Sequence, residues 1–192
     1  MKIVRYSIHI IDEIGKIENV NISNVLDTCL IGFKIEKVSD KEIVFINESG
    51  EVVTIKPQGI IYTRKGKDVG NESIYDKLRC LLNVLNVKEE FKGAIELTAV
   101  APVKESAFRE SLKEVTISNE NLSKIENITG IGIRIFNETD TYTQDFKKEP
   151  FIANHKLFYY NLTRLYNKKN IDLLTLTKDL NNIYINKNNE FI

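Results

Sequence analysis

Histidine and cysteine are scarce in this chain of 192 residues, which contains two of each. The histidines, His9 and His155, are too few for a zinc site built mainly from histidine, and the two cysteines show no ligand spacing. We therefore expect no metal bound through side-chain nitrogen or sulfur, and no motif indicates a cofactor. Cys29 lies in an apolar run and Cys80 in an expected helix, which favours reduced, packed thiols, although a bridge between them is also compatible with the sequence.

An excess of charge of one sign is lacking as well, since 27 Lys and Arg residues balance 27 Asp and Glu residues. No overall field attracts the chain to nucleic acid or to an anionic membrane, so a nucleic-acid partner would require a local basic patch. No apolar run reaches the roughly 18 residues of a membrane span. Asp12 and Glu13 occupy the place where a signal peptide would have small residues, and we expect a cytosolic protein.

The first half of the sequence is rich in expected strands. Residues 2–11 and 29–38 are apolar and partly alternating, and EIVFIN and EVVTIK flank a turn at Asn47–Gly50 that predicts a hairpin. A short strand, GIIYT, leads to a helix that opens at Ser73. The apolar residues of this helix fall on one face: Ile74, Leu78, Leu81, Leu82 and Leu85.

The same order of elements then restarts. A strand at 93–102 precedes a short helix near Phe108 and Leu112, a polar segment at 118–127, further strands and the apolar run 157–166. The chain ends in a helix that begins near Asp172, with inward residues Leu173, Leu176, Leu180, Ile183 and Tyr184.

These patterns predict an α+β protein of mostly antiparallel sheet with amphipathic helices on one face. We expect two β-rich halves packed as one unit: 1–90, closed by a helix at about 73–86, and 91–192, closed by a helix at about 173–186. The similarity of IGFKIEK (31–37) to IGIRIFN (131–137) is compatible with a duplication.

Two glycines in the segment ITGIGIRIF do not form a dinucleotide-binding loop. Gly130 and Gly132 are followed by Ile135 where a third glycine would stand, and by a strand where a helix would begin. In a strand, the isoleucines of this segment would face the core, whereas both glycines and Arg134 would face the other way. The glycines then form either a packing notch or a shallow groove for a ligand.

The hairpin that follows supplies charge beside these glycines. If Thr139-Asp140 is its turn, Arg134 lies opposite Asp145, with Lys147 and Glu149 across from the glycines. Basic residues are frequent from here to the end of the chain, and aromatic residues alternate with them. That composition suits either a nucleic-acid surface or a half-buried sheet. Its members are Lys147, Lys148, Lys156, Arg164, Lys168 and Lys169, with Phe151, Phe158, Tyr159 and Tyr160.

Catalytic signals are weaker. Glu90-Phe91-Lys92 before a strand resembles the Glu-x-Lys half of a metal-dependent nuclease core, but the nearest upstream aspartate, Asp76, lies within a helix. His155, near several lysines, could act as a general base in an RNase. The alternative to both interpretations is a solvated turn or loop.

The segments VFINESGEVVTIKP and GIGIRIF...DFKKEPF...LFYYNL resemble an uncharacterised, sporadically distributed bacterial family of strand-rich, two-part domains, over residues 42 to 185. The resemblance implies no activity and is compatible with phage-defence, counter-defence or other mobile-element roles. We therefore predict a non-enzymatic binding module that contacts a protein or a second copy of itself through a sheet edge. Metal-dependent nuclease or RNase activity is the alternative. The expected binding residues are Gly130, Gly132, Arg134, Lys147 and Lys148, and the alternative catalytic residues are Glu90, Lys92 and His155.

Overall fold

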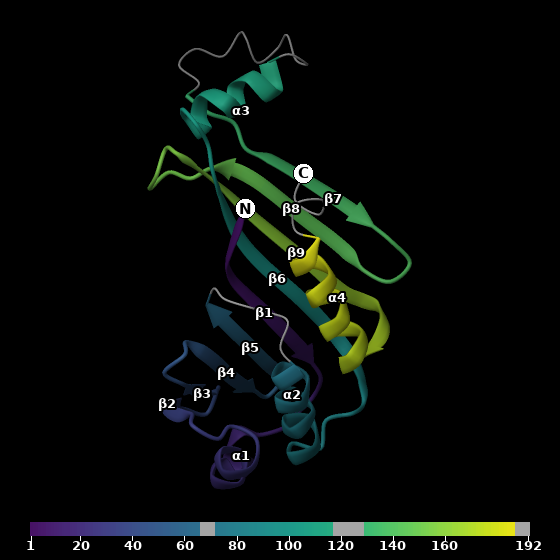
Figure 1. Ribbon diagram of the computed structural model, residues 1–192. Helices are drawn as coiled ribbons and strands as arrows, with labels where there is room; N and C mark the ends of the chain where they lie inside the picture. Colours follow the sequence, from purple (N-terminus) through teal and green to yellow (C-terminus); the bar gives the residue numbers. More distant parts are fainter. Residues whose placement is uncertain (66–71, 117–128, 187–192) are drawn as a thin grey trace.

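A computed structural model describes residues 1–65, 72–116 and 129–186. Its strands form one nine-stranded sheet in which every neighbouring pair is antiparallel, in the order β2-β3-β4-β5-β1-β6-β9-β8-β7 (Figure 1). The strands are β1 Lys2–Ile11, β2 Lys34–Val38, β3 Ile43–Ile46, β4 Glu51–Lys56, β5 Gly59–Lys65, β6 Glu90–Pro102, β7 Ile133–Glu138, β8 Thr143–Pro150 and β9 Leu157–Asp172. The α-helices are α1 Ile22–Thr28, α2 Glu72–Val84, α3 Ala107–Thr116 and α4 Leu173–Ile185, and a 3-10 turn spans Ile17–Asn19.

The chain crosses the middle of the sheet twice. β1 and β6 are the central neighbours, and from each of them the chain passes through a short helix to the outer edge and returns strand by strand. α2 follows the first set of strands and α4 follows the second. The α+β class with antiparallel sheet and helices on one face is therefore confirmed, and the two sets of strands share one continuous sheet.

The core lies between the sheet and the helices α2 and α4, which contact each other (Figure 1). The apolar stripe expected for the first helix is buried at Ile74, Leu78, Leu81 and Leu82, and that of the last helix at Leu173, Leu176, Leu180 and Ile183. Asp172 begins α4 by accepting a hydrogen bond from the amide of Thr175 at 2.6 Å. α1 packs beside α2, and α3 lies at the opposite end of the sheet.

The second face of the sheet carries the residues that alternate with the core. In β4 and β9, buried positions alternate regularly with half-exposed ones, as in an antiparallel sheet with one solvated face. The side chains of Ser7 and Thr63, in neighbouring strands, point to this face and are hydrogen-bonded at 2.9 Å, with Ser7 itself buried. We call this solvent-facing surface the open face.

The segment 29–38 differs from its expected single strand. Residues 22–28 form α1, whose first turn is capped by the side chain of Asn21, and Cys29 ends that helix. Only Lys34–Val38 is a strand, β2, and it forms one edge of the sheet. Before it, Cys29, Leu30 and Phe33 are buried in the core, whereas Ile31 is 80% exposed.

The expectation of reduced cysteines is wrong. A disulfide joins Cys29 at the end of α1 to Cys80 in α2, with a Cα–Cα distance of 5.5 Å. Sequence spacing could not reveal this contact, because it depends on α1, a short helix that was not expected at residues 22–28.

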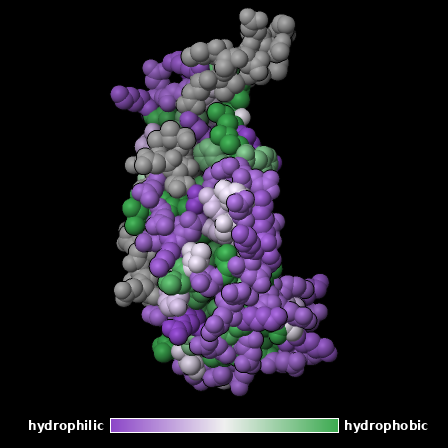
Figure 2. Space-filling model, turned by 90° about the vertical axis from the view of Figure 1, so that its right-hand side faces the viewer, coloured by the Kyte–Doolittle hydropathy of each residue, from purple (hydrophilic) through white to green (hydrophobic). Residues whose placement is uncertain are grey.

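Other boundaries moved less. β6 begins at Glu90, so Glu90-Phe91-Lys92 lies within a strand and not in a turn before it. The polar segment expected at 118–127 lies outside the described residues. None of the helices in the described ranges is long and apolar enough to cross a membrane. Figure 2 shows one side of the molecule, on which hydrophilic residues predominate and hydrophobic ones form small separate patches.

Candidate functional site

The β7–β8 hairpin contains most of the expected binding residues, but its register differs by two residues from the expected one. Arg134 pairs with Lys147, and Phe136 pairs with Asp145. The difference arises from the turn, which spans four residues: the amide of Thr139 donates to the carbonyl of Tyr142 at 2.9 Å. The hydroxyl of Thr139 accepts from the two amides that precede the second strand, which stabilises this longer turn.

An even shift leaves the facing of every side chain unchanged, so Arg134 and Asp145 still share the open face. The guanidinium donates two hydrogen bonds to the carboxylate, from Nε at 2.9 Å and from Nη2 at 2.7 Å. These hydrogen bonds lower the pKa of Asp145 below its ordinary value. Lys147 Nζ lies 3.9 Å from the same carboxylate, and Arg134 stacks over the ring of Phe136 at 4.5 Å. Phe136 is 63% exposed.

Lys148 does not join this group. Successive residues of a strand face opposite sides, and Lys148 Nζ lies over the ring of the buried residue Phe158 at 4.8 Å. The structure therefore brings Arg134 and Lys147 together on the open face and places Lys148 on the helix-bearing face.

The two glycines precede β7 and have different surroundings. A Cβ at Gly130 would lie 2.6 Å from the ring of Phe108 in α3, so this glycine allows close packing of that helix. A Cβ at Gly132 would lie 3.1 Å from Cβ of Glu149, a tighter contact than usual but with an exposed neighbour. Gly130 is a packing notch, whereas Gly132 lies on the exposed margin of the hairpin.

The isoleucines of this segment are not core residues. β7 is the outermost strand of the described sheet, and Ile135 is 51% exposed there. Ile131 and Ile133 are half-buried. The alternation was interpreted correctly, but a strand at the margin has too few neighbours to bury its inner face.

The alternative catalytic residues are not brought together. Glu90 and Lys92 lie at the start of β6, whereas His155 lies in the β8–β9 connection beside the end of that strand. A strand of this length separates its ends by about 40 Å. His155 packs edge-on against Phe108 at 4.8 Å, and its carbonyl accepts a hydrogen bond from the amide of Ala107.

An acid that the sequence did not suggest lies near Glu90. Asp172, at the end of β9, pairs directly with Glu90. Its carboxylate already caps α4, and hydrogen bonds from the backbone and side chain of Thr175 lower its pKa. Within the described ranges, no three His, Cys, Asp or Glu side chains are grouped so that they could hold a metal ion.

The basic and aromatic residues of the C-terminal half divide between the two faces of the sheet. Phe158, Tyr160 and Arg164 are buried beneath the helices, and Phe151 stacks on Tyr159 at 6.1 Å on the half-exposed side. Arg164 donates to Asp179 of α4 at 2.9 Å and to Gln144 at 2.6 Å. The cluster is therefore a half-buried sheet and not a continuous basic surface.

The middle of the open face is polar. His9 and Glu96 lie on the central strands with Nε2 and Oε2 3.8 Å apart. The interaction with the nearby imidazole of His9 lowers the pKa of Glu96. Thr98, Asn161 and Thr163 extend this strip towards β8, and the amide of Asn161 donates to the carbonyl of Leu97. Short hydroxyl and amide side chains can hydrogen-bond a partner at little cost in conformational entropy.

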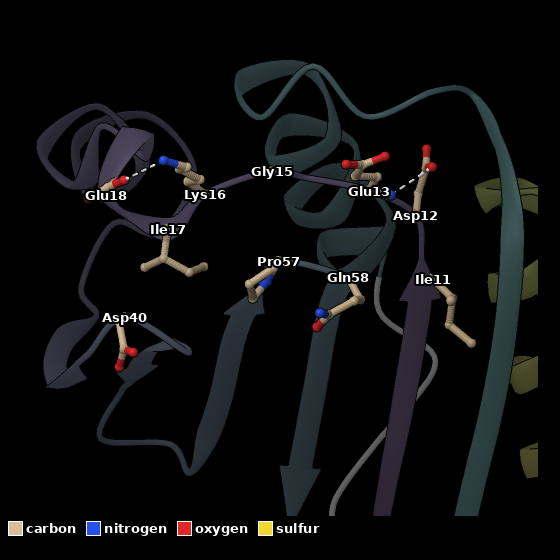
Figure 3. Close-up of a pocket in the computed structure, with 10 residues that line it drawn as sticks. All are labelled: Ile11, Asp12, Glu13, Gly15, Lys16, Ile17, Glu18, Asp40, Pro57 and Gln58. Carbon is tan, nitrogen blue, oxygen red and sulfur yellow. Dashed lines mark hydrogen bonds and ion pairs between the residues drawn. The ribbon is translucent and has the colours of Figure 1, made fainter.

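A cavity of about 740 Å³ lies at the end of the sheet where β1 leaves it (Figure 3). The connection from β1 to α1 passes over the Pro57–Gln58 turn of the β4–β5 hairpin, and the amide of Ile14 donates to the carbonyl of Pro57 at 2.9 Å. The apolar lining residues are Ile11, Ile17 and Pro57. The polar ones are Asp12, Glu13, Lys16, Glu18, Asp40 and Gln58.

Gly59 allows this turn to lie close to β1. Its φ is +148°, and a Cβ there would lie 2.0 Å from the carbonyl oxygen of Ile10. Nothing in the sequence singled out this end of the molecule, because its lining residues come from three connections that are distant in the chain.

Comparisons with protein-family models, curated proteins and solved structures found no match.

Proposed function

We propose that this protein is a non-enzymatic binding module that contacts a protein partner with the open face of its sheet, centred on the β7–β8 hairpin. The observation that carries the proposal is the distribution of helices. They lie on one face of a nine-stranded sheet, and the other face presents the partly exposed polar side chains of His9, Glu96 and Thr98 on its central strands. Such a broad and regular surface suits recognition of a macromolecule better than enclosure of a small substrate.

The charges of the open face favour a protein over a nucleic acid. Arg134 and Lys147 lie beside Asp145, and Glu96 lies on a central strand. A polyanion would meet these carboxylates as it crossed the sheet, and like-charge contacts oppose binding. A protein surface can match both signs.

Exposed apolar residues on β7 add contact area at the same place. Phe136 projects from the open face and Ile135 from the other side of the strand, and both are more than half exposed. In the described part of the chain β7 pairs only with β8. An outer strand with apolar side chains can accept a further strand from a partner or from a second copy of this chain.

Charge reversal at the hairpin tests this proposal. We expect Lys147→Glu to slow partner association in a salt-dependent way, because a charge at the border of an interface mainly affects the association rate. Captured host proteins would be identified by mass spectrometry, with Lys104→Glu as the matched control at an exposed position outside the hairpin. A partner lost with Lys147→Glu and kept with Lys104→Glu supports the site, and identical capture by both variants contradicts it.

Gly132→Val tests the contact more directly. The added side chain would crowd Glu149 at the exposed margin of the hairpin, and we expect weaker partner binding or weaker self-association with the fold retained. Light scattering measures self-association and calorimetry measures binding to a captured partner. Normal binding with reduced stability would assign Gly132 to packing, as the structure already does for Gly130.

The nuclease alternative rests on Glu90, Lys92 and the paired residue Asp172. If these residues hold a divalent cation, Mg²⁺ or Mn²⁺ will raise the melting temperature saturably, and Glu90→Ala will abolish that increase. For a binding module without such a site, we expect the melting temperature to be unchanged by either cation.

A further inference from the structure

We propose that the cavity at the β1–α1 connection binds an extended segment of a protein partner that carries an apolar side chain flanked by Lys or Arg. This inference extends the proposed function to a second contact, at the opposite end of the sheet from α3 (Figures 1 and 3).

The apolar part of the site is its lining. Ile11 is 43% exposed although it ends a central strand, and Pro57 and the buried residue Ile17 line the same cavity. A hollow of about 740 Å³ has room for one or two side chains. Burial of an apolar side chain against this lining would supply the hydrophobic part of the binding free energy.

The charged part of the site is acidic. Among the described residues that line this cavity, Lys16 is the only cation, and its Nζ lies 3.4 Å from Oε1 of Glu18. The rim carries three further carboxylates. Asp12, Glu13 and Asp40 have no ion-pair partner among the residues that the structure describes. Asp12 accepts a hydrogen bond from the amide of Glu13 at 2.8 Å, which helps to fix its carboxylate on the rim. On the side of Asp40 an adjoining depression also carries Lys37, Lys41 and Lys56, of which Lys37 and Lys56 pair with Glu42. The acidic charge of the cavity is therefore concentrated at Asp12 and Glu13, and that side of the rim complements a cationic ligand.

Two features favour a peptide over a small amine. The side chain of Gln58 also lines the cavity, and its amide group can donate to and accept from a peptide backbone. The hollow also continues onto the open face: Ile11 and Gln58 line a neighbouring depression together with His9 and Ile61. A segment bound in the cavity can therefore continue along the surface proposed for the partner.

Short capped peptides test the site on the isolated protein. The probes are acetyl-Lys-Leu-Lys-amide, acetyl-Lys-Ser-Lys-amide and acetyl-Glu-Leu-Glu-amide, followed by amide chemical shifts in a ¹⁵N-labelled sample. We expect saturable shifts at Ile11–Ile17 and at Gln58 with the first peptide, weaker binding with the second and none with the third. Equal shifts with the acidic peptide, or no saturable shifts in the millimolar range with any probe, would overturn the proposal.

A variant in which the three carboxylates of the rim are replaced by neutral amides tests where the peptide binds. Asp12→Asn, Glu13→Gln and Asp40→Asn together should weaken binding of the first peptide about fivefold or more, since its two lysines lose their weak ion pairs with the rim. The matched control neutralises three exposed carboxylates elsewhere, Asp27→Asn, Glu36→Gln and Asp76→Asn, and should leave the affinity unchanged. If both variants weakened peptide binding equally, the effect would arise from the overall charge of the protein, and the proposed site would be contradicted. These titrations need no natural partner. A negative result would therefore contradict the peptide site at the cavity, whereas a negative result with the hairpin variants would contradict the proposed function.

Discussion

The two halves of the sheet each bury a charged group beneath the helix that covers them, but the signs are opposite. In the first half Glu51 of β4 lies under Lys77 of α2, with Nζ and Oε2 2.9 Å apart. In the second half Arg164 of β9 lies under Asp179 of α4, with Nη1 and Oδ1 also 2.9 Å apart. A tyrosine hydroxyl completes each group: Tyr62 donates to Glu51, and Tyr166 donates to Asp179.

The two groups correspond only in part. Arg164 lies on the last strand of its half, β9, whereas Glu51 lies on β4 and the member of its group on the last strand, β5, is Tyr62. The separation along the chain from Tyr62 to Lys77 equals that from Arg164 to Asp179. The helix supplies the cation in one half and the anion in the other. The arrangement therefore requires a compensated charge between helix and sheet and does not require a particular sign. Whether the two halves arose by duplication stays a prediction.

Disruption of the core of one half should have the largest effect on the free energy of unfolding, and it tests whether the two halves fold independently. Leu78→Asp or Leu82→Asp places a carboxylate in the apolar core under α2 and should cost several kcal/mol, enough to unfold most of the protein. Because β1 and β6 are paired along their length, we expect the second half to unfold with the first. Circular dichroism with urea measures the loss.

Leu180→Asp is the matched change under α4. It should give the same result, with one cooperative transition. If instead amide exchange showed one half protected and the other unfolded in either variant, the halves would be separate folding units.

The disulfide distinguishes the halves next, because in the described residues only the first half has one. Cys29 and Cys80 are 51 residues apart, and closure of such a loop stabilises the folded state by about 4 kcal/mol in the chain-entropy treatment. We expect dithiothreitol to lower the urea midpoint, and Cys29→Ser with Cys80→Ser to lower it equally. A thiol titration in denaturant that found two free thiols in the untreated protein would contradict the bridge.

Local patterns were sufficient to predict most elements. The stripes of α2 and α4, the Asn47–Gly50 hairpin and the long central strands follow from periodicity and turn residues, which act over a few positions. α1 was not predicted because its seven residues are too short for a helical period to stand out, and a single capping residue, Asn21, does not define a helix.

The candidate site was harder to predict because it depends on register and on edges. Two extra residues in the Thr139–Tyr142 turn shifted the β8 partner of every β7 residue. The exposure of Ile135 followed from the position of β7 in the sheet, which strand patterns do not determine. The acidic cavity joins residues from three connections, and no local pattern could bring them together.

Removal of one partner from each buried ion pair should have an intermediate effect on the free energy of unfolding. Lys77→Met removes the cation beside the carboxylate of Glu51, and Asp179→Asn removes the carboxylate of α4 that Arg164 contacts. Both remaining groups are less than a tenth exposed, so each change should cost about 2–3 kcal/mol, somewhat below the loss for a fully buried pair.

Urea denaturation measures both losses, and Lys16→Met, which breaks an exposed pair with Glu18, should stay within about 0.5 kcal/mol. A large loss in one half and none in the other would contradict the equivalence of the two groups.

Acidification should have the smallest effect on stability, and one of the groups that it titrates is buried beneath a helix: in the first half the buried charged group on the sheet is a carboxylate, Glu51. Burial alone would raise the pKa of Glu51, but hydrogen bonds from Tyr62, Lys77 and Asn47 outweigh it, and its pKa lies below the ordinary value of 4.5. A lowered pKa means that the stabilisation is complete above the ordinary value and is lost as the pH falls through the folded-state value. Glu96 and Asp145 on the open face, whose pKa values are also lowered, add to the same trend.

Glu51→Gln separates these contributions. The variant should be less stable than the wild type at neutral pH, since Lys77 loses its anion, but it should lose less on transfer to about pH 4 because the titrating group is gone. Urea midpoints at the two pH values measure the difference, with Glu89→Gln as an exposed control that should keep the wild-type dependence. If Glu51→Gln kept the full acid sensitivity, the loss would arise from the carboxylates of the open face, and the buried groups of the two halves would respond alike to pH.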